Sequence, residues 1–184
     1  MSHERKGYPH MSLEQFRDSL GDFARDTRIN IGTILTEEGA PGLTLKQIQG
    51  TALACTYATG SLPLRAALEA EFRESLTPED LAAAKAAASI MAMNNVYYRF
   101  LHMVEDDDVT ALPAKLRMQV IGKPGIDKVT FEVFCLAVSA IAGCQNCIKS
   151  HASELKKVGI APEGIQSAVR IASVINAAAV SQRI

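Results

Sequence analysis

The sequence has no excess of charge of either sign, because 19 Lys and Arg residues face 20 Asp and Glu residues. Proteins that bind nucleic acid are typically basic, so that class is disfavoured. No apolar run reaches the roughly 18 residues that a membrane-spanning helix needs, and the longest candidates are interrupted by Lys85, Arg170 and Asn176. Residues 1–10 are polar and lack the apolar centre of a secretory signal. We therefore predict a cytoplasmic protein that binds neither nucleic acid nor membranes.

Hydrophobic residues make up 48% of the 184 residues and charged residues 21%, a balance typical of a globular chain. A chain of this length builds one domain of ordinary size. We expect residues 11–184 to form that single domain. Residues 1–10 are expected to be a tag or a disordered extension, and they are left out of the fold prediction.

Strand signals are weak, because no long segment alternates apolar and polar residues. Alanine-rich stretches and helical spacing of apolar residues predict an all-α fold instead. Four helices are expected before the middle of the chain, at residues 12–28, 44–59, 62–74 and from Thr77 onward. Thr77 is a suitable N-cap and Pro78 suits the first helical turn. The helix that follows is apolar nearly all round as far as Met93, so we expect it to be buried.

The two parts of the chain share a weak pattern. Thr77-Pro78-Glu79 is matched 84 residues later by Ala161-Pro162-Glu163. We interpret this as two similar halves, at about residues 44–104 and 128–184. At the same offset Cys144 aligns with Gly60 and Cys147 with Pro63, so only the second half carries the cysteine pair.

There are four cysteines: Cys55, Cys135, Cys144 and Cys147. Structural disulfides are rare in a reducing cytosol, so a close pair there indicates redox chemistry or metal binding. Two cysteines alone do not fill a structural zinc site, which usually has four ligands. Cys55 and Cys135 have no motif around them and are expected in the core.

Gly143 is suited to end one helix, which places Cys144 at the start of the next. On that helix Cys144, Cys147 and His151 share one face, because they are three and four residues apart. Free N–H groups and the helix dipole at a helix start favour a thiolate. His151 is suited to accept or return the thiol proton.

Glu132 lies on the preceding predicted helix, which is apolar and can pack beside the helix that carries the cysteines. A buried carboxylate there needs a partner, and His151 is the candidate. The hypothesis is a relay from Glu132 through His151 to the cysteine pair.

These residues carry a resemblance to the alkyl hydroperoxidase D (AhpD) family, in the carboxymuconolactone decarboxylase-like superfamily. It spans nearly the whole chain from Met11 onward. The most specific feature is Glu132 followed by Cys144, Cys147 and His151 at their observed spacing, together with the Met-Asn-Asn-Val sequence at residues 93–96. The matching segments are residues 93–99, 124–132, 137–141 and 143–147, together with His151.

The resemblance implies an all-helical bundle of two similar halves that assembles as a homotrimer. It implies an antioxidant alkyl hydroperoxide reductase with no bound cofactor, reduced by dihydrolipoamide on a lipoylated 2-oxoacid dehydrogenase component. It also implies that the protein reduces the peroxiredoxin AhpC. By resemblance, Cys147 attacks the peroxide and becomes a sulfenic acid, and Cys144 donates a proton and closes a disulfide. Glu132 and His151 match the proton-relay residues.

One position departs from the family. Several AhpD proteins have histidine immediately before the second cysteine, whereas this chain has Asn146, which does not titrate near neutral pH. Two other functions stay open from the sequence. One is a carboxymuconolactone-type decarboxylase, although that reaction needs no redox pair. The other is a thiol or metal-binding module that uses Cys144, Cys147 and His151 as ligands.

Overall fold

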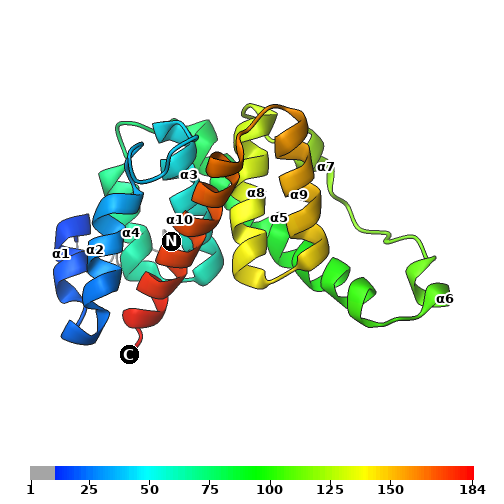
Figure 1. The fold of residues 1–184 in the computed structure, drawn as a ribbon, viewed down its shortest axis with the longest axis horizontal. Coiled ribbons are helices and arrows are strands. Elements are labelled where there is room, and N and C mark those ends of the chain that lie inside the picture. The colour runs from blue at the N-terminus through cyan, green and yellow to red at the C-terminus, as the bar shows by residue number, and fades with distance from the viewer. Residues whose placement is uncertain (1–10) are drawn as a thin grey trace, which may run out of the picture.

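The computed structural model describes residues 11–184, and over this range the chain is helical with no strand (Figure 1). The all-α prediction is confirmed. The helices in the first part of the chain are α1 (Leu13–Ser19), the 3₁₀-helix η1 (Asp22–Ala24), α2 (Arg25–Ile34), α3 (Leu45–Thr59), α4 (Leu62–Glu71) and α5 (Pro78–Met103). They are followed by α6 (Asp107–Thr110), α7 (Gln119–Gly122), α8 (Lys128–Ala142), α9 (Gln145–Lys157) and α10 (Pro162–Ser181).

Side-chain caps fix several helix starts. Ser12, Thr44 and Thr77 each form a capping box with the residue three positions on. The helix expected over residues 12–28 is wrong as a single element: α1 ends at Ser19, and α2 starts only at Arg25. Gly21 has extended backbone between them, which breaks the helix.

Four helices form the centre of the molecule. α3 and α8 pack against each other and each also packs against α5 and α10. The inward faces of the four helices are fully buried at Ile48, Met91, Phe134 and Ile171. α3 and α8 approach closely at Gly50, where an added Cβ would fall on the ring of Phe134. This packing buries only one face of the alanine-rich part of α5, at Ala84, Ala87 and Met91, and leaves Lys85 and Ser89 exposed, so the expected burial of the whole helix is wrong.

The succession α3, α4, α5 is followed later in the chain by the similar succession α8, α9, α10. α3 ends at Gly60 and α8 ends at Gly143, and both glycines are left-handed, with φ of 73° and 68°. The next helices begin at the N-caps Ser61 and Cys144. Ser61 and Cys144 therefore occupy equivalent positions as N-caps. This alignment differs by one residue from the sequence alignment, which matched Cys144 with Gly60. That the halves arose by duplication stays a prediction.

Residues 104–118, which include α6, extend away from the packed helices in Figure 1. Within this segment the side chain of Asp106 caps the short helix α6. The chain returns to the bundle at α7. Over residues 11–184, no helix has both the length and the apolar character required to cross a membrane.

Candidate active site

Cys144 and Cys147 lie at the junction of α8 and α9 and form a disulfide bond, with their Cα atoms 5.3 Å apart. The left-handed Gly143 ends α8 and turns the chain so that Cys144 becomes the N-cap of α9. Cys144 Sγ accepts the backbone N–H of Cys147 at 3.3 Å. The first sulfur therefore lies where the unpaired amides of a helix start stabilise negative charge.

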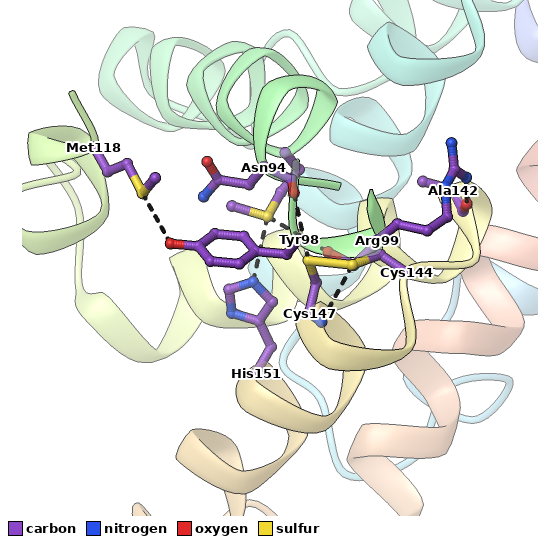
Figure 2. The surroundings of a disulfide bond; sticks show 10 residues. Asn94, Tyr98, Arg99, Met118, Ala142, Cys144, Cys147 and His151 are labelled. Atoms are coloured by element: carbon purple, nitrogen blue, oxygen red, sulfur yellow. Dashed lines mark hydrogen bonds between the residues drawn. A yellow bond between two sulfur atoms is a disulfide. The ribbon is translucent and has the colours of Figure 1, made fainter. Parts of the chain in front are cut away.

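The two sulfurs differ in access. Cys144 is fully buried, whereas Cys147 keeps 6% of its surface exposed and lines a cavity of about 370 Å³. Figure 2 shows His151 and Tyr98 on the Cys147 side of the disulfide and Arg99 on the Cys144 side. A small molecule that enters the cavity therefore meets Cys147 first.

Glu132 on α8 and His151 on α9 contact each other across the helix pair. His151 Nδ1 lies 2.6 Å from Glu132 Oε2, and both side chains are buried. The structure thus brings together the two residues that the relay hypothesis pairs, and both line the cavity with Cys147. The carboxylate fixes the orientation of the ring.

The second nitrogen of His151 hydrogen-bonds to a methionine sulfur and not to a cysteine sulfur. His151 Nε2 lies 3.3 Å from Met91 Sδ on α5, a thioether that also accepts the Ser139 hydroxyl at 3.4 Å. The connection from His151 to Cys147 therefore runs through the cavity, where a bound molecule can bridge the two. The sequence predicted Met91 as a core residue, and only the packing of α5 on α9 reveals its contact with His151.

One wall of the cavity is apolar. Tyr98 on α5 and Met118, just before α7, meet across it, with the Tyr98 hydroxyl 3.6 Å from Met118 Sδ. Ile121 adds to this wall, and Asn94 and Asn146 add amide groups elsewhere in the lining. The cavity can therefore hold a molecule with a polar end at Cys147 and an organic end at Tyr98 and Met118.

The other two cysteines are free thiols in the core, as predicted. Burial raises the pKa of Cys55 far above its ordinary value. Burial, and then the nearby charge of Glu132, raise the pKa of Cys135 in the same direction. Neither thiol is suited to act as a nucleophile at neutral pH.

Arg99 ties the long helix α5 to this junction. Its Nη1 donates to the carbonyl oxygen of Ala142, the last residue of α8, at 2.7 Å.

Among residues 11–184, no group of three or more His, Cys, Asp or Glu side chains is arranged to hold a metal ion.

On this all-helical scaffold, a disulfide at a helix start lies beside a cavity and a buried carboxylate–imidazole pair, an arrangement typical of a thiol-redox protein. The carboxymuconolactone decarboxylase family model matches residues 107–183 of this chain. This range contains the four site residues Glu132, Cys144, Cys147 and His151. Curated relatives extend the match to nearly the whole chain.

The chain is 50% identical to the alkyl hydroperoxide reductase AhpD of Rhizorhabdus wittichii over 169 residues, which cover 92% of this chain and 96% of the relative. It is 49% identical to the protein of the same name from Hyphomonas neptunium, over 92% of both chains. It is 48% identical to that from Azorhizobium caulinodans, over 93% of both chains. The chain belongs to the AhpD family.

Proposed function

We propose that this protein is an alkyl hydroperoxide reductase in which Cys147 and Cys144 form the redox pair. The observation that carries the proposal is the position of Cys147, which forms part of the cavity wall together with the paired Glu132 and His151. The names of the relatives support the same activity. We place this reaction in a reducing cytoplasm, where the pair can be returned to dithiol.

The oxidative half of the cycle has two steps. The Cys147 thiolate attacks the terminal oxygen of the hydroperoxide, an S–O bond forms, the O–O bond breaks, and the alkoxide leaves and takes up a proton. The product is a Cys147 sulfenic acid and an alcohol. The Cys144 thiol then gives up its proton as its sulfur attacks the sulfenic sulfur, the S–O bond breaks, and the hydroxide leaves with that proton as water while the disulfide closes. The Cα separation of 5.3 Å allows this closure without a change of fold.

Glu132 and His151 serve this cycle as a proton relay. The Glu132 carboxylate orients the ring, and His151 moves protons to and from molecules in the cavity. Because Nε2 faces Met91 in the disulfide state, the relay reaches Cys147 through a bridging molecule or by a turn of the ring. No role is assigned to Asn146 in this transfer, since its amide does not titrate.

The reductive half is assigned to dihydrolipoamide on a lipoylated 2-oxoacid dehydrogenase component. Its thiolate attacks Cys147, because Cys144 is fully buried and does not line the cavity. Cys144 is then the leaving thiolate, and the N–H of Cys147 stabilises it. The second thiol of the lipoyl group resolves the mixed disulfide. The reduced protein also serves as the disulfide reductase of the peroxiredoxin AhpC.

We also propose a homotrimer. Val96, Phe100 and Met103 lie along one face of the last turns of α5 and are 49–70% exposed. Leu112 and Leu116, in the extending segment, are exposed as well. An apolar surface formed by neighbouring helix turns is typical of an interface between subunits.

Turnover of a hydroperoxide with dihydrolipoamide tests the activity. Cys147→Ser should reduce turnover to background, and Cys144→Ser should stop the cycle after one oxidation. Cys55→Ser is the matched control, because it makes the same chemical change in the core and should retain turnover. Full activity of Cys147→Ser would overturn the mechanism.

The match to the carboxymuconolactone decarboxylase family model favours a second candidate, decarboxylation of a lactone acid. That reaction does not need a disulfide. A double variant of Cys144 and Cys147 that still decarboxylates such a substrate would favour this alternative.

A further inference from the structure

The cavity contains a buried amide that the mechanism above does not use. Asn94 on α5 is 4% exposed, lines the cavity, and its Oδ1 has no hydrogen-bond partner among residues 11–184. A buried polar atom without a partner costs stability, so its presence calls for a physical reason. The lining position offers one, because a molecule in the cavity can bind the amide.

Asn94 is also adjacent to the reacting sulfur. Its backbone carbonyl oxygen lies 3.9 Å from Cys147 Sγ, and Figure 2 shows its side chain extending along the same side of the site as Tyr98. The neighbouring Asn95 makes the contrast clear. Asn95 is 2% exposed and both of its amide atoms lack hydrogen-bond partners within the part of the chain that the structure describes, but it does not line the cavity. The position beside Cys147, and not the unpaired state alone, singles out Asn94.

The hydrogen-bonding groups of the Asn94 amide complement those of a hydroperoxide. A hydroperoxide end carries one O–H donor and oxygen acceptors, and a carboxamide offers one acceptor oxygen and an NH₂ donor. The other buried groups are already engaged, since Glu132 pairs with His151 Nδ1 and Nε2 faces Met91.

We propose that Asn94 binds and orients the hydroperoxide at Cys147, an inference that rests on the proposed peroxidase function. Asn94 Oδ1 accepts the O–H of the terminal oxygen, which Cys147 attacks, and Nδ2 donates to the oxygen that carries the alkyl group. As the O–O bond breaks, the electron pair goes to that second oxygen, and the N–H bond stabilises its developing charge. Asn94 transfers no proton. The alkoxide is protonated through His151.

The test separates oxidation from the other reactions of the same sulfur. Asn94→Leu keeps the size of the side chain and removes both hydrogen-bonding groups, and Asn94→Ala is a second variant in case the branched side chain disturbs packing. The prereduced protein is mixed with cumene hydroperoxide, and formation of the 144–147 disulfide is followed by mass spectrometry after quenching. The second-order rate constant should fall about tenfold to a hundredfold, the loss expected for a hydrogen bond to a developing charge.

Two further rates show whether the loss is specific. Alkylation of Cys147 by iodoacetamide and reduction of the preformed disulfide by dihydrolipoamide should both stay within about twofold of wild type, because neither involves a hydroperoxide. Asn95→Leu should leave the oxidation rate close to wild type. The thermal unfolding midpoint of each variant checks the fold.

The inference is overturned if the Asn94 variants react with cumene hydroperoxide at the wild-type rate. It is also overturned if alkylation falls in proportion to oxidation, because Asn94 would then act on the thiolate and not on the peroxide. Failure of the proposed function has a different signature, in which the wild-type protein itself forms no disulfide with the hydroperoxide.

Discussion

At the residue scale, His151 is held between two groups that accept hydrogen bonds. Glu132 Oε2 lies at Nδ1 and the Met91 thioether lies at Nε2, and a thioether offers only a weak acceptor. The carboxylate therefore dominates the orientation of the ring. Because Met91 and Glu132 come from α5 and α8, the packing of these two helices sets the position of the imidazole.

Glu132→Gln tests this arrangement. The amide keeps the size of the side chain but loses the carboxylate that pairs with His151 Nδ1 in the proposed relay, so we expect the rate of hydroperoxide turnover to fall about tenfold or more. Steady-state turnover over a range of pH measures the effect. Glu163→Gln, at the exposed start of α10, is the matched control and should match wild type. A Glu132→Gln protein with an unchanged rate and pH profile would remove Glu132 from the relay.

At the scale of the elements, the start of α5 is held by a group of interacting polar side chains. Asp80 completes the capping box with Thr77 and lies 2.8 Å from Lys46 Nζ on α3. Burial raises the pKa of Asp80, but the bonds from Lys46 and Thr77 outweigh it and hold the pKa below the ordinary 3.8. The ionised carboxylate therefore ties α3 to α5 at neutral pH.

Asp80→Asn should lower the free energy of unfolding at pH 7 by about 0.5–1 kcal/mol, because the amide loses the ion pair with Lys46 while Thr77 still caps α5. Since the pKa is lower in the folded state, the carboxylate stabilises the fold above pH 3.8. That contribution is lost as the pH falls through the folded value. Urea unfolding of both proteins at pH 7 and near pH 3 measures the difference in their free energies of unfolding. This difference should be smaller near pH 3. A difference of constant size would contradict this role of the charge.

The helix starts could be predicted from the sequence because capping is local. Thr44 and Thr77 are followed by side chains that complete their boxes, and Gly143 is suited to the left-handed end of α8. Contacts between segments that are distant in the chain could not be predicted in this way. Nothing near Gly50 shows that the ring of Phe134 packs on it, and nothing near Met91 shows that it faces His151. Such pairs depend on the packing of whole helices, which the helical period alone does not specify.

The candidate site residues that could be predicted from the sequence are likewise close together in the chain. Cys144, Cys147 and His151 follow one another on a single helix, so their spacing predicts a shared face. Glu132 needed both the break at Gly143 and the family resemblance. The buried amide of Asn94 carried no signal of its own, because it belongs to a different helix and only its place in the cavity distinguishes it.

At the scale of the whole molecule, the cavity lies where α5 of the first half meets α8 and α9 of the second. The end of α5 and the segment after it extend from the bundle (Figure 1) and carry exposed apolar side chains. The proposed subunit interface is thus continuous with the helix that supplies Asn94 and Tyr98 to the cavity.

Phe100→Asp should weaken the proposed trimer, because it places a charge within the apolar face of α5. Light scattering after size-exclusion chromatography should show a shift from three chains per particle toward one. Phe23→Asp is the matched control, since Phe23 is 66% exposed on η1 at the other end of the molecule. A wild-type protein that elutes as a monomer would remove the trimer from the account.

A single-turnover reaction tests the central claim most directly. The fully reduced protein is mixed with one equivalent of hydroperoxide, quenched with an alkylating reagent at successive times, and mapped by peptide mass spectrometry. We expect one alcohol released for each protein oxidised, with Cys144 and Cys147 joined and Cys55 and Cys135 still free thiols. If Cys144 and Cys147 both remain open to alkylation while the hydroperoxide is consumed, the cysteine pair is not the site of the reaction.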